Sequence, residues 1–293
     1  MVKQSLEKLR VKDDWRSERG RIFREAEAIR ALSPVLGSET LPKIVHVGLE
    51  DYLFVMTAAP RGSVTWKEAL LAGQVDLGVA RRAGKLLALM IAASQRDSSF
   101  QAAFAERAVF DQLRIAPYYR TTAARHPDVR RPMEKLIEDT WKIRTALVHG
   151  DYSPKNLLVH DDGIFLIDFE VVHWGDPAFD AAFLLNHLFL KAFHQPQHAG
   201  AYFSAAREFW GELVRAAAEA PRAEFENMTM RHLGALMLAR IDGKSPVEYI
   251  RHETTKERVR AFSKRLVLEG MQLLEDTMSA ARTAVPALNR ESR

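Results

Sequence analysis

Residues 147–180 read LVHGDYSPKNLLVHDDGIFLIDFEVVHWGDPAFD, and the interpretation of the whole chain depends on them. This stretch places a dense set of polar side chains around two short apolar runs. They are His149, Asp151, Asn156, Asp168, Glu170, Asp176 and Asp180. Polar groups packed against apolar segments must be satisfied by one another, by solvent or by a bound charge. Their partners therefore indicate what the protein does.

The two apolar runs predict a β-hairpin. NLLV and IFLID are short and rich in strand-forming residues, and HDDG between them is a turn signal that contains Asp161 and Asp162. If the two aspartates form the loop, Asn156 lies opposite position 167; if the second aspartate and the glycine form it, Asn156 lies opposite position 169. In either register Asp168 falls within one residue of facing Asn156, and directly opposed Cβ atoms are roughly 5 Å apart.

An amide oxygen and a carboxylate are thus expected together at the open end of the hairpin. This geometry suits a hard divalent cation such as Mg²⁺, which takes oxygen ligands and keeps several waters. Asp151, on the loop before the first strand, lies near the same end. We expect no positive side chain to be needed for charge balance there, so that a metal ion is the natural partner.

The order of these residues resembles that of a known family. The spacing H-x-D-x-x-x-x-N from His149 to Asn156 is the kinase catalytic-loop pattern, and Asp168 stands where the metal-binding aspartate follows. With HGDYSPKN, IDFE and GDPAFD together, the sequence resembles the aminoglycoside phosphotransferase and choline kinase family, relatives of the protein kinases. The resemblance extends over most of the chain.

The resemblance implies an α+β, protein kinase-like fold with two lobes: a truncated small N-lobe and a large, mainly helical C-lobe. It also implies transfer of the γ-phosphate of ATP to a hydroxyl of a small molecule, with Mg²⁺. Asp151 takes the place of the catalytic base, and Asn156 and Asp168 take those of the magnesium ligands. Such chemistry depends on positioning and charge neutralisation, because the transition state spreads negative charge over oxygen atoms.

The remaining polar residues of the stretch are expected to support the site. We interpret His149 as a scaffold histidine and not a general base. Lys155 either touches the transferred phosphate or is simply solvated, and Glu170 either assists the metal site or caps a neighbouring turn. Asp176 and Asp180 are expected to brace the loop and the start of the next helix.

The nucleotide side of the site is predicted at the N-terminus. VKQSLEKLRV, within a possible strand at 2–11, resembles the family's strand that bears the phosphate-binding lysine, which makes Lys3 the candidate. A helix is predicted from Asp14 to Leu32, and on it Glu25 is the candidate partner of Lys3. Pro34, Gly37 and Pro42 are read as a loop after that helix.

Segment 54–60, FVMTAAP, fits the linker between lobes, where the backbone of Met56, Thr57 and Ala58 is expected to bond adenine. The family's phosphate-covering loop has no counterpart before Lys3, and we expect a shortened start. Residues 1–59 are therefore predicted to form a partial N-lobe with a hinge at about 56–60. Residues 60–293 form the helical C-lobe, with the catalytic loop and hairpin at 147–170.

Composition excludes several other classes of protein. The 293 residues include no cysteine, so disulfide frameworks, zinc ribbons and thiol catalysis are excluded. The net charge is +4, but basic residues are scattered among acids, which argues against nucleic-acid binding. There is no secretory signal, and the apolar segments are too short to span a membrane, so we expect a cytoplasmic protein. His187, His194 and His198 show no zinc-site spacing and are assigned to a partly exposed helix end.

The acceptor is predicted to bind among the helices after Arg61. The C-terminal helices mix charges of both signs, which favours a metabolic alcohol or sugar over a polycationic aminoglycoside. Two rival functions remain open: a pseudokinase-like module that binds nucleotide without turnover, and a metal-dependent hydrolase. The complete set of Asp151, Asn156 and Asp168 favours the kinase, and the single tight ligand pair disfavours the hydrolase.

Overall fold

The small sheet at the N-terminal end of the chain forms around its middle strand. In the order β1-β3-β2, β3 (Leu53–Met56) lies between β1 (Val2–Gln4) and β2 (Ile44–Gly48), and both pairings are antiparallel. Alternate residues of β3, Phe54 and Met56, are buried. They pack on Ile22 and Ala26 of the helix between β1 and β2, which gives the sheet one apolar face.

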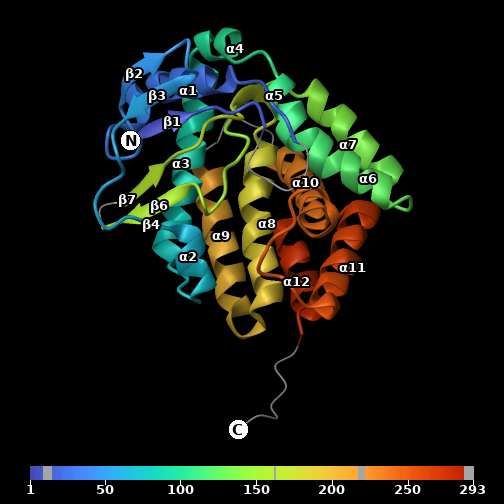
Figure 1. The fold of residues 1–293 in the computed structure, drawn as a ribbon. Coiled ribbons are helices and arrows are strands. Elements are labelled where there is room, and N and C mark those ends of the chain that lie inside the picture. The colour runs from blue at the N-terminus through green and yellow to red at the C-terminus, as the bar shows by residue number, and fades with distance from the viewer. Residues whose placement is uncertain (9–14, 162, 217–221, 287–293) are drawn as a thin grey trace.

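The computed structural model describes residues 1–8, 15–161, 163–216 and 222–286. Figure 1 shows the small sheet at one end of a large helical body, which confirms the predicted α+β, kinase-like class. Within the described residues, no helix combines the length and apolar character needed to cross a membrane.

Helix α1 (Arg21–Leu36) differs in its bounds from the helix predicted at Asp14–Leu32. Residues 15–20 are not helical, and Asp14 itself lies outside the described residues. Pro34 lies inside the last turn, where it has no N–H to donate to the carbonyl four residues before it, and Gly37 ends the helix at φ 77°. The predicted apolar face is confirmed, since Ile22, Ala26 and Ile29 are each about 1% exposed. Of the possible strand at 2–11, the structure shows β1, and residues 9–11 lie outside the described residues.

The helical body surrounds one helix, α8 (Ala178–His194), that is buried almost throughout. Figure 1 shows α9 and α10 running beside it. The other elements of the body are α2 (Trp66–Leu71), α3 (Leu77–Arg96), α4 (Ser99–Ala103), α5 (Ala108–Phe110), the π-helical η1 (Asp111–Arg120), α6 (Thr121–Arg125), α7 (Arg130–Lys142), the 3₁₀ turn η2 (Pro196–His198), α9 (Ala199–Ala216), α10 (Arg222–Asp242), α11 (Glu253–Glu269) and α12 (Leu274–Ala284). An apolar surface on all sides is what a central helix requires.

The predicted hairpin is present, and its register is the first of the two alternatives. Strand β6 (Leu157–His160) pairs with β7 (Gly163–Leu166), with His160 opposite Gly163. The Ile167 N–H donates to the Asn156 carbonyl at 3.1 Å, so position 167 faces Asn156.

Three further short strands hold this segment in place. β4 (Val64–Thr65) adds to β6, and β5 (Ala146–Val148) pairs with β8 (His173–Gly175) on either side of the loop and hairpin. Strands of two or three residues show no periodicity, which is why the sequence did not predict them.

The main hydrophobic core does not stop at residue 59. Trp15, Ile29, Leu32 and Leu41 belong to the same buried cluster as the helical body. The Leu166 N–H also donates to the Thr40 carbonyl at 2.8 Å, which ties the hairpin to the N-terminal part. The buried cluster therefore extends across the boundary near residue 59, and the division into two lobes there stays a prediction.

A glycine sets the distance between α3 and α9. A Cβ on Gly84 would lie 2.2 Å from the Phe209 carbonyl oxygen, so the two helices touch through their backbones. We expect Gly84→Ala to lower the free energy of unfolding by about 1–3 kcal/mol through overpacking, as measured by urea denaturation. Gly211→Ala on α9, where a Cβ meets nothing within 4 Å, is the matched control and should be neutral or stabilising. Equal losses in both variants would contradict close packing at Gly84.

Candidate active site

The loop between β5 and β6 is held by a buried carboxylate at the start of α8. Asp180 accepts the backbone N–H groups of His149 at 2.6 Å and Gly150 at 2.9 Å. Gly150 has φ 78°, and a Cβ there would lie 2.7 Å from Val171, so only glycine fits. Asp180 therefore braces the loop in the predicted manner.

His149 is a fully buried, neutral part of the scaffold. Its Nδ1 accepts the Asp151 N–H at 3.2 Å, and its Nε2 lies 3.2 Å from the Ile167 carbonyl. The ring also packs on Phe169, with 4.5 Å between ring centroids. Burial lowers the pKa of His149 to about 4, so the imidazole is neutral near pH 7. This geometry agrees with a scaffold role and gives the ring no access to a substrate proton.

Asp151 is a buried carboxylate surrounded by donors. Its Oδ1 lies 3.1 Å from the Arg114 guanidinium, and its Oδ2 lies 2.9 Å from Lys155 Nζ and accepts from Asn156 Nδ2 at 2.9 Å. Burial opposes ionisation, but Lys155 and Arg114 outweigh it and hold the pKa of Asp151 below its usual value. The group is therefore ionised and faces a cavity, as a proton acceptor must be.

Asn156 and Asp168 offer the oxygen ligands predicted for a metal. The Asn156 amide nitrogen donates to Asp151 twice, to Oδ2 and to the carbonyl, so its amide oxygen is directed away from Asp151. Asp168 has φ 72°, a conformation uncommon for a residue with a side chain and often found at functional sites. Within the described residues no cluster of three or more acids or histidines could hold a metal. The pair fits Mg²⁺, which takes its remaining ligands from phosphate and water.

Lys3 connects the small sheet to this pair. Its Nζ lies 2.6 Å from Glu25 Oε2 and 2.6 Å from Asp168 Oδ1. Burial disfavours the charge of Lys3, but Asp168 and Glu25 outweigh it and raise its pKa, while burial raises the pKa of Glu25 to about 8. The structure thus brings the predicted lysine and glutamate together, and adds Asp168 to them.

The expectation that this end of the hairpin lacks positive side chains was wrong. Lys3 and Lys155 lie 2.6 Å and 4.0 Å from the Asp168 carboxylate, and Lys155 and Arg114 flank Asp151. The two carboxylates are balanced by protein cations without a metal. The reason is long-range: Lys3 and Arg114 come from segments far away in the sequence.

Glu170 has a partner that the sequence did not indicate. Its carboxylate accepts from Arg21 Nε of α1 at 3.0 Å, and so ties the segment after Asp168 to that helix. Asp176 has the expected bracing role. It accepts the Ala178 N–H at the start of α8 at 3.0 Å and lies 3.3 Å from Nε2 of the buried His232.

The expected adenine contacts need one correction. Both backbone groups of Met56 are bonded to residue 1: its N–H donates to the Met1 carbonyl at 2.9 Å, and its carbonyl accepts from the Met1 amino group at 2.7 Å. The Thr57 N–H donates to Lys43. Strand β1 thus occupies this edge of β3, and only the Thr57 carbonyl and Ala58 remain for a ligand.

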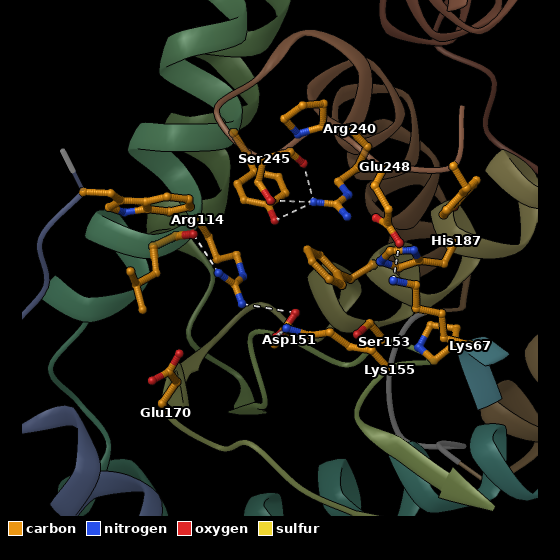
Figure 2. Close-up of a pocket in the computed structure, with 17 residues that line it drawn as sticks. Lys67, Arg114, Asp151, Ser153, Lys155, Glu170, His187, Arg240, Ser245 and Glu248 are labelled. Atoms are coloured by element: carbon orange, nitrogen blue, oxygen red, sulfur yellow. Dashed lines mark hydrogen bonds and ion pairs between the residues drawn. The ribbon is translucent and has the colours of Figure 1, made fainter. Parts of the chain in front are cut away.

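A cavity of about 300 Å³ opens beside Asp151. Figure 2 shows the catalytic-loop residues Asp151, Ser153 and Lys155 on one side of it, and Arg240 and Ser245 on the other. Its lining also includes Lys67, Arg114, Tyr118, Glu170, Phe183, His187, Glu248 and Tyr249. The cavity lies among the helices after Arg61, where the acceptor was expected.

A family model described as the phosphotransferase enzyme family matches residues 7–217. The chain belongs to this family. No curated protein matches the sequence. Among solved structures, an amicoumacin kinase in complex with AMP-PNP and Ca²⁺ is 16% identical, covers 88% of this chain and 80% of its own, and has a TM-score of 0.51.

A glucosamine kinase has the same TM-score of 0.51 at 16% identity, covering 98% of this chain and 73% of its own. An ADP-bound aminoglycoside phosphotransferase covers 92% and 86% at 17% identity, with a TM-score of 0.47. The likeness to the two kinases with a TM-score of 0.51 shows the fold. Together with the family match it confirms the resemblance that the motifs indicated, and the chain is a phosphotransferase of the kinase type.

Sequence patterns did not indicate several residues that shape the site of this phosphotransferase. Arg114 lies on η1 and reaches Asp151 from 37 positions upstream, and its Nε also donates to the Gly150 carbonyl at 2.6 Å. Arg240 and Tyr249 reach the cavity from the end of α10 and the loop after it. His187 was assigned to a partly exposed helix end, but it is 8% exposed and lines the cavity.

The lowered pKa of His149 predicts a specific dependence of stability on pH. An unfolded histidine titrates near 6.5, so between about pH 6.5 and pH 4 the unfolded chain binds a proton that the folded phosphotransferase does not. The free energy of unfolding should therefore fall on acidification, by about 3 kcal/mol from this group. Urea titrations across this range should show the fall in the wild type and a smaller one in His149→Gln. Parallel curves would contradict a neutral, buried His149.

Proposed function

We propose that this phosphotransferase moves the γ-phosphate of ATP to a hydroxyl group of a small molecule bound in the cavity. The observation that supports this most is the position of Asp151: an ionised carboxylate at the wall of the cavity, next to Asn156 and Asp168. ATP use and the absence of cysteine favour a cytoplasmic location.

The residues would divide the reaction as follows. The acceptor hydroxyl donates a hydrogen bond to Asp151, and its oxygen attacks the γ-phosphorus while the bond to the β,γ-bridging oxygen breaks. The hydroxyl proton passes to Asp151, and the products are a phosphate monoester and ADP. The low pKa of Asp151 makes it a weak base, which suits a loose transition state in which proton transfer comes late and orientation matters most.

On the nucleotide side, Lys3 would bind phosphate oxygens while Glu25 holds it in place, and Ala58 with the Thr57 carbonyl would meet the adenine. Asn156 and Asp168 would hold Mg²⁺, which when bound neutralises phosphate charge. Lys155 is 53% exposed on its side chain and lies between Asp151 and Asp168, so it can follow the transferred phosphoryl group.

A second candidate is nucleotide binding without turnover. The ion pairs of Lys3 with Asp168 and of Lys155 with Asp151 favour it, because a substrate must compete with them. The two candidates differ in one measurement, which is ATP consumption that depends on Asp151.

Asp151→Asn keeps the shape of the side chain but removes the proton acceptor. We expect kcat to fall about 10²–10⁴-fold in ATP-consumption assays with Mg²⁺ across a panel of sugars, amino alcohols and hydroxy acids. Asp161→Asn, in the exposed turn of the hairpin, is the matched control and should keep wild-type rates. An unaffected Asp151→Asn enzyme would rule out this role, and a folded wild type inactive on every acceptor would favour binding without turnover.

The metal assignment has its own test in binding. Asp168→Ala removes a ligand proposed for Mg²⁺, so it should weaken Mg²⁺-dependent binding of a non-hydrolysable ATP analogue by at least about 10-fold in calorimetry. Asp151→Ala should have a smaller effect, because Asp151 faces the acceptor. The reverse order would contradict the division of roles between the two carboxylates.

A further inference from the structure

The cavity beside Asp151 has two sides of different chemistry. The catalytic loop provides Asp151 and Lys155, and the wall across from it comes from the end of α10 and the loop that follows (Figure 2). On that far wall lie Arg240, Glu248 and Tyr249. The reactive side would bind the acceptor hydroxyl and the phosphate, so the far wall would bind the rest of the acceptor.

Every acid that lines the cavity already has a basic partner. Asp151 is paired with Arg114 and Lys155, Glu170 with Arg21, and Glu248 with Lys67 across the rim. A cationic acceptor would therefore find no free carboxylate among the lining residues. It would have to break one of these pairs.

Arg240 is the opposite case, a cation with no acid. Its Nη1 donates to neutral oxygens only: the Tyr118 hydroxyl at 3.2 Å, the Ser245 hydroxyl at 2.9 Å and the Ser245 carbonyl. Its Nε is buried and has no partner, and no carboxylate of the described residues lies within ion-pair distance. Guanidinium groups match carboxylates and phosphates with paired donors, so an oxyanion is the partner that Arg240 lacks.

A second basic group without an acid as ion-pair partner lies behind the same wall. Lys191 of α8 is fully buried, and its Nζ lies 5.1 Å from the ring centre of Tyr249 and 3.4 Å from the His187 carbonyl. Burial lowers the pKa of Lys191 to about 7, and the charges of Lys67 and Arg240 add to this. The far wall thus holds one guanidinium and, behind it, one basic amine, and neither has an ion-pair partner among the described residues.

Two hydroxyl groups at the cavity also lack partners. They are Tyr249 Oη and Ser153 Oγ, and both belong to residues that line the cavity. Each oxygen is buried and makes no hydrogen bond with the described residues. Ser153 is only 1% exposed. Buried polar atoms without partners are costly and uncommon, so a ligand that accepts hydrogen bonds is their expected partner.

We propose that the acceptor of this phosphotransferase carries an oxyanion, a carboxylate or a phosphate ester, which Arg240 and the Tyr249 hydroxyl bind at the far wall. This rests on the proposed function, and specifies the acceptor as an anionic hydroxyl compound. The oxyanion takes no part in the transfer; it anchors the molecule so that its hydroxyl meets Asp151. Polycationic acceptors are excluded by the same charges.

The test uses four ligands built on one ring: glucuronate, glucose 6-phosphate, glucose and glucosamine. Binding is measured by calorimetry with Mg²⁺ and ADP present, and turnover by ATP consumption. We expect at least one of the two anions to bind about 10-fold or more tighter than glucose, and glucosamine to bind no better than glucose. The two anionic arms distinguish a carboxylate from a phosphate.

Two variants assign the effect to the far wall. Tyr249→Phe removes a hydroxyl that has no partner, so the fold should be unaffected, while anion affinity drops about 10-fold and glucose affinity changes less than about twofold. Arg240→Met should abolish the preference for anions, and its folding is checked by circular dichroism. Asp151→Asn should keep the preference while losing turnover.

The outcomes separate the two proposals. Anion preference that depends on Tyr249, with no ATP consumed, would overturn the proposed function and leave the anion site standing. ATP-dependent turnover of glucose or glucosamine in preference to the anions would overturn the anion site alone. Absence of binding by all four ligands, or equal binding in the wild type and Tyr249→Phe, would also overturn it.

Discussion

The rest of the site depends on one constraint: Asp151 must stay charged while it is buried. An ionised carboxylate that is only 5% exposed requires close compensation, because removing it from water costs several kcal/mol. Arg114, Lys155 and the Asn156 amide provide this within about 3 Å. The loop can hold these contacts because His149 and Asp180 fix its backbone from below. Catalytic geometry and stability thus rest on the same bonds.

Charge compensation also joins the N-terminal sheet to the segment that follows the hairpin. Lys3 is shared between Glu25 of α1 and Asp168 after the hairpin, so the small sheet, its helix and the segment of Asp168 meet at one ammonium group. A triphosphate with Mg²⁺ would supply both the anion that Lys3 needs and the cation that Asp168 needs. Nucleotide binding would therefore replace the Lys3–Asp168 ion pair by contacts of Lys3 with phosphate and of Asp168 with Mg²⁺. It would leave no unpaired charge in the buried site.

The sequence predicted the parts of this site that are local in the chain. The turn HDDG and two short strands placed Asn156 beside the segment of Asp168, and the loop spacing placed Asp151 next to them. The cations that compensate Asp151 and Asp168 were not predictable in the same way. Arg114 is positioned by the π-helical η1, and Lys3 lies on a strand 165 positions before Asp168. The hydrophobic pattern of a sequence indicates which faces of an element are apolar. It does not indicate which cations from distant segments lie next to a given carboxylate.

The predicted start of helix α1 was wrong for a related reason. Charged residues before Gly20 have the composition of a helix, yet Arg21 uses its guanidinium to bond the carbonyls of Ser17 and Glu18 as well as Glu170. Those contacts depend on the segment after Asp168, which no local window contains. Tertiary contacts override local propensity here, as they often do at helix ends.

The far wall of the cavity shows how function and stability diverge. A core selected for stability alone would pair Arg240 with an acid and replace Lys191 by an apolar residue, since isolated buried charges are destabilising. The protein has neither feature. Glu248 is close enough to raise the pKa of Lys191, but its ion-pair partner is Lys67. An unpaired guanidinium next to an unpartnered hydroxyl is a costly arrangement. The anion proposed for this wall would offset that cost under the condition in which the proposed reaction takes place.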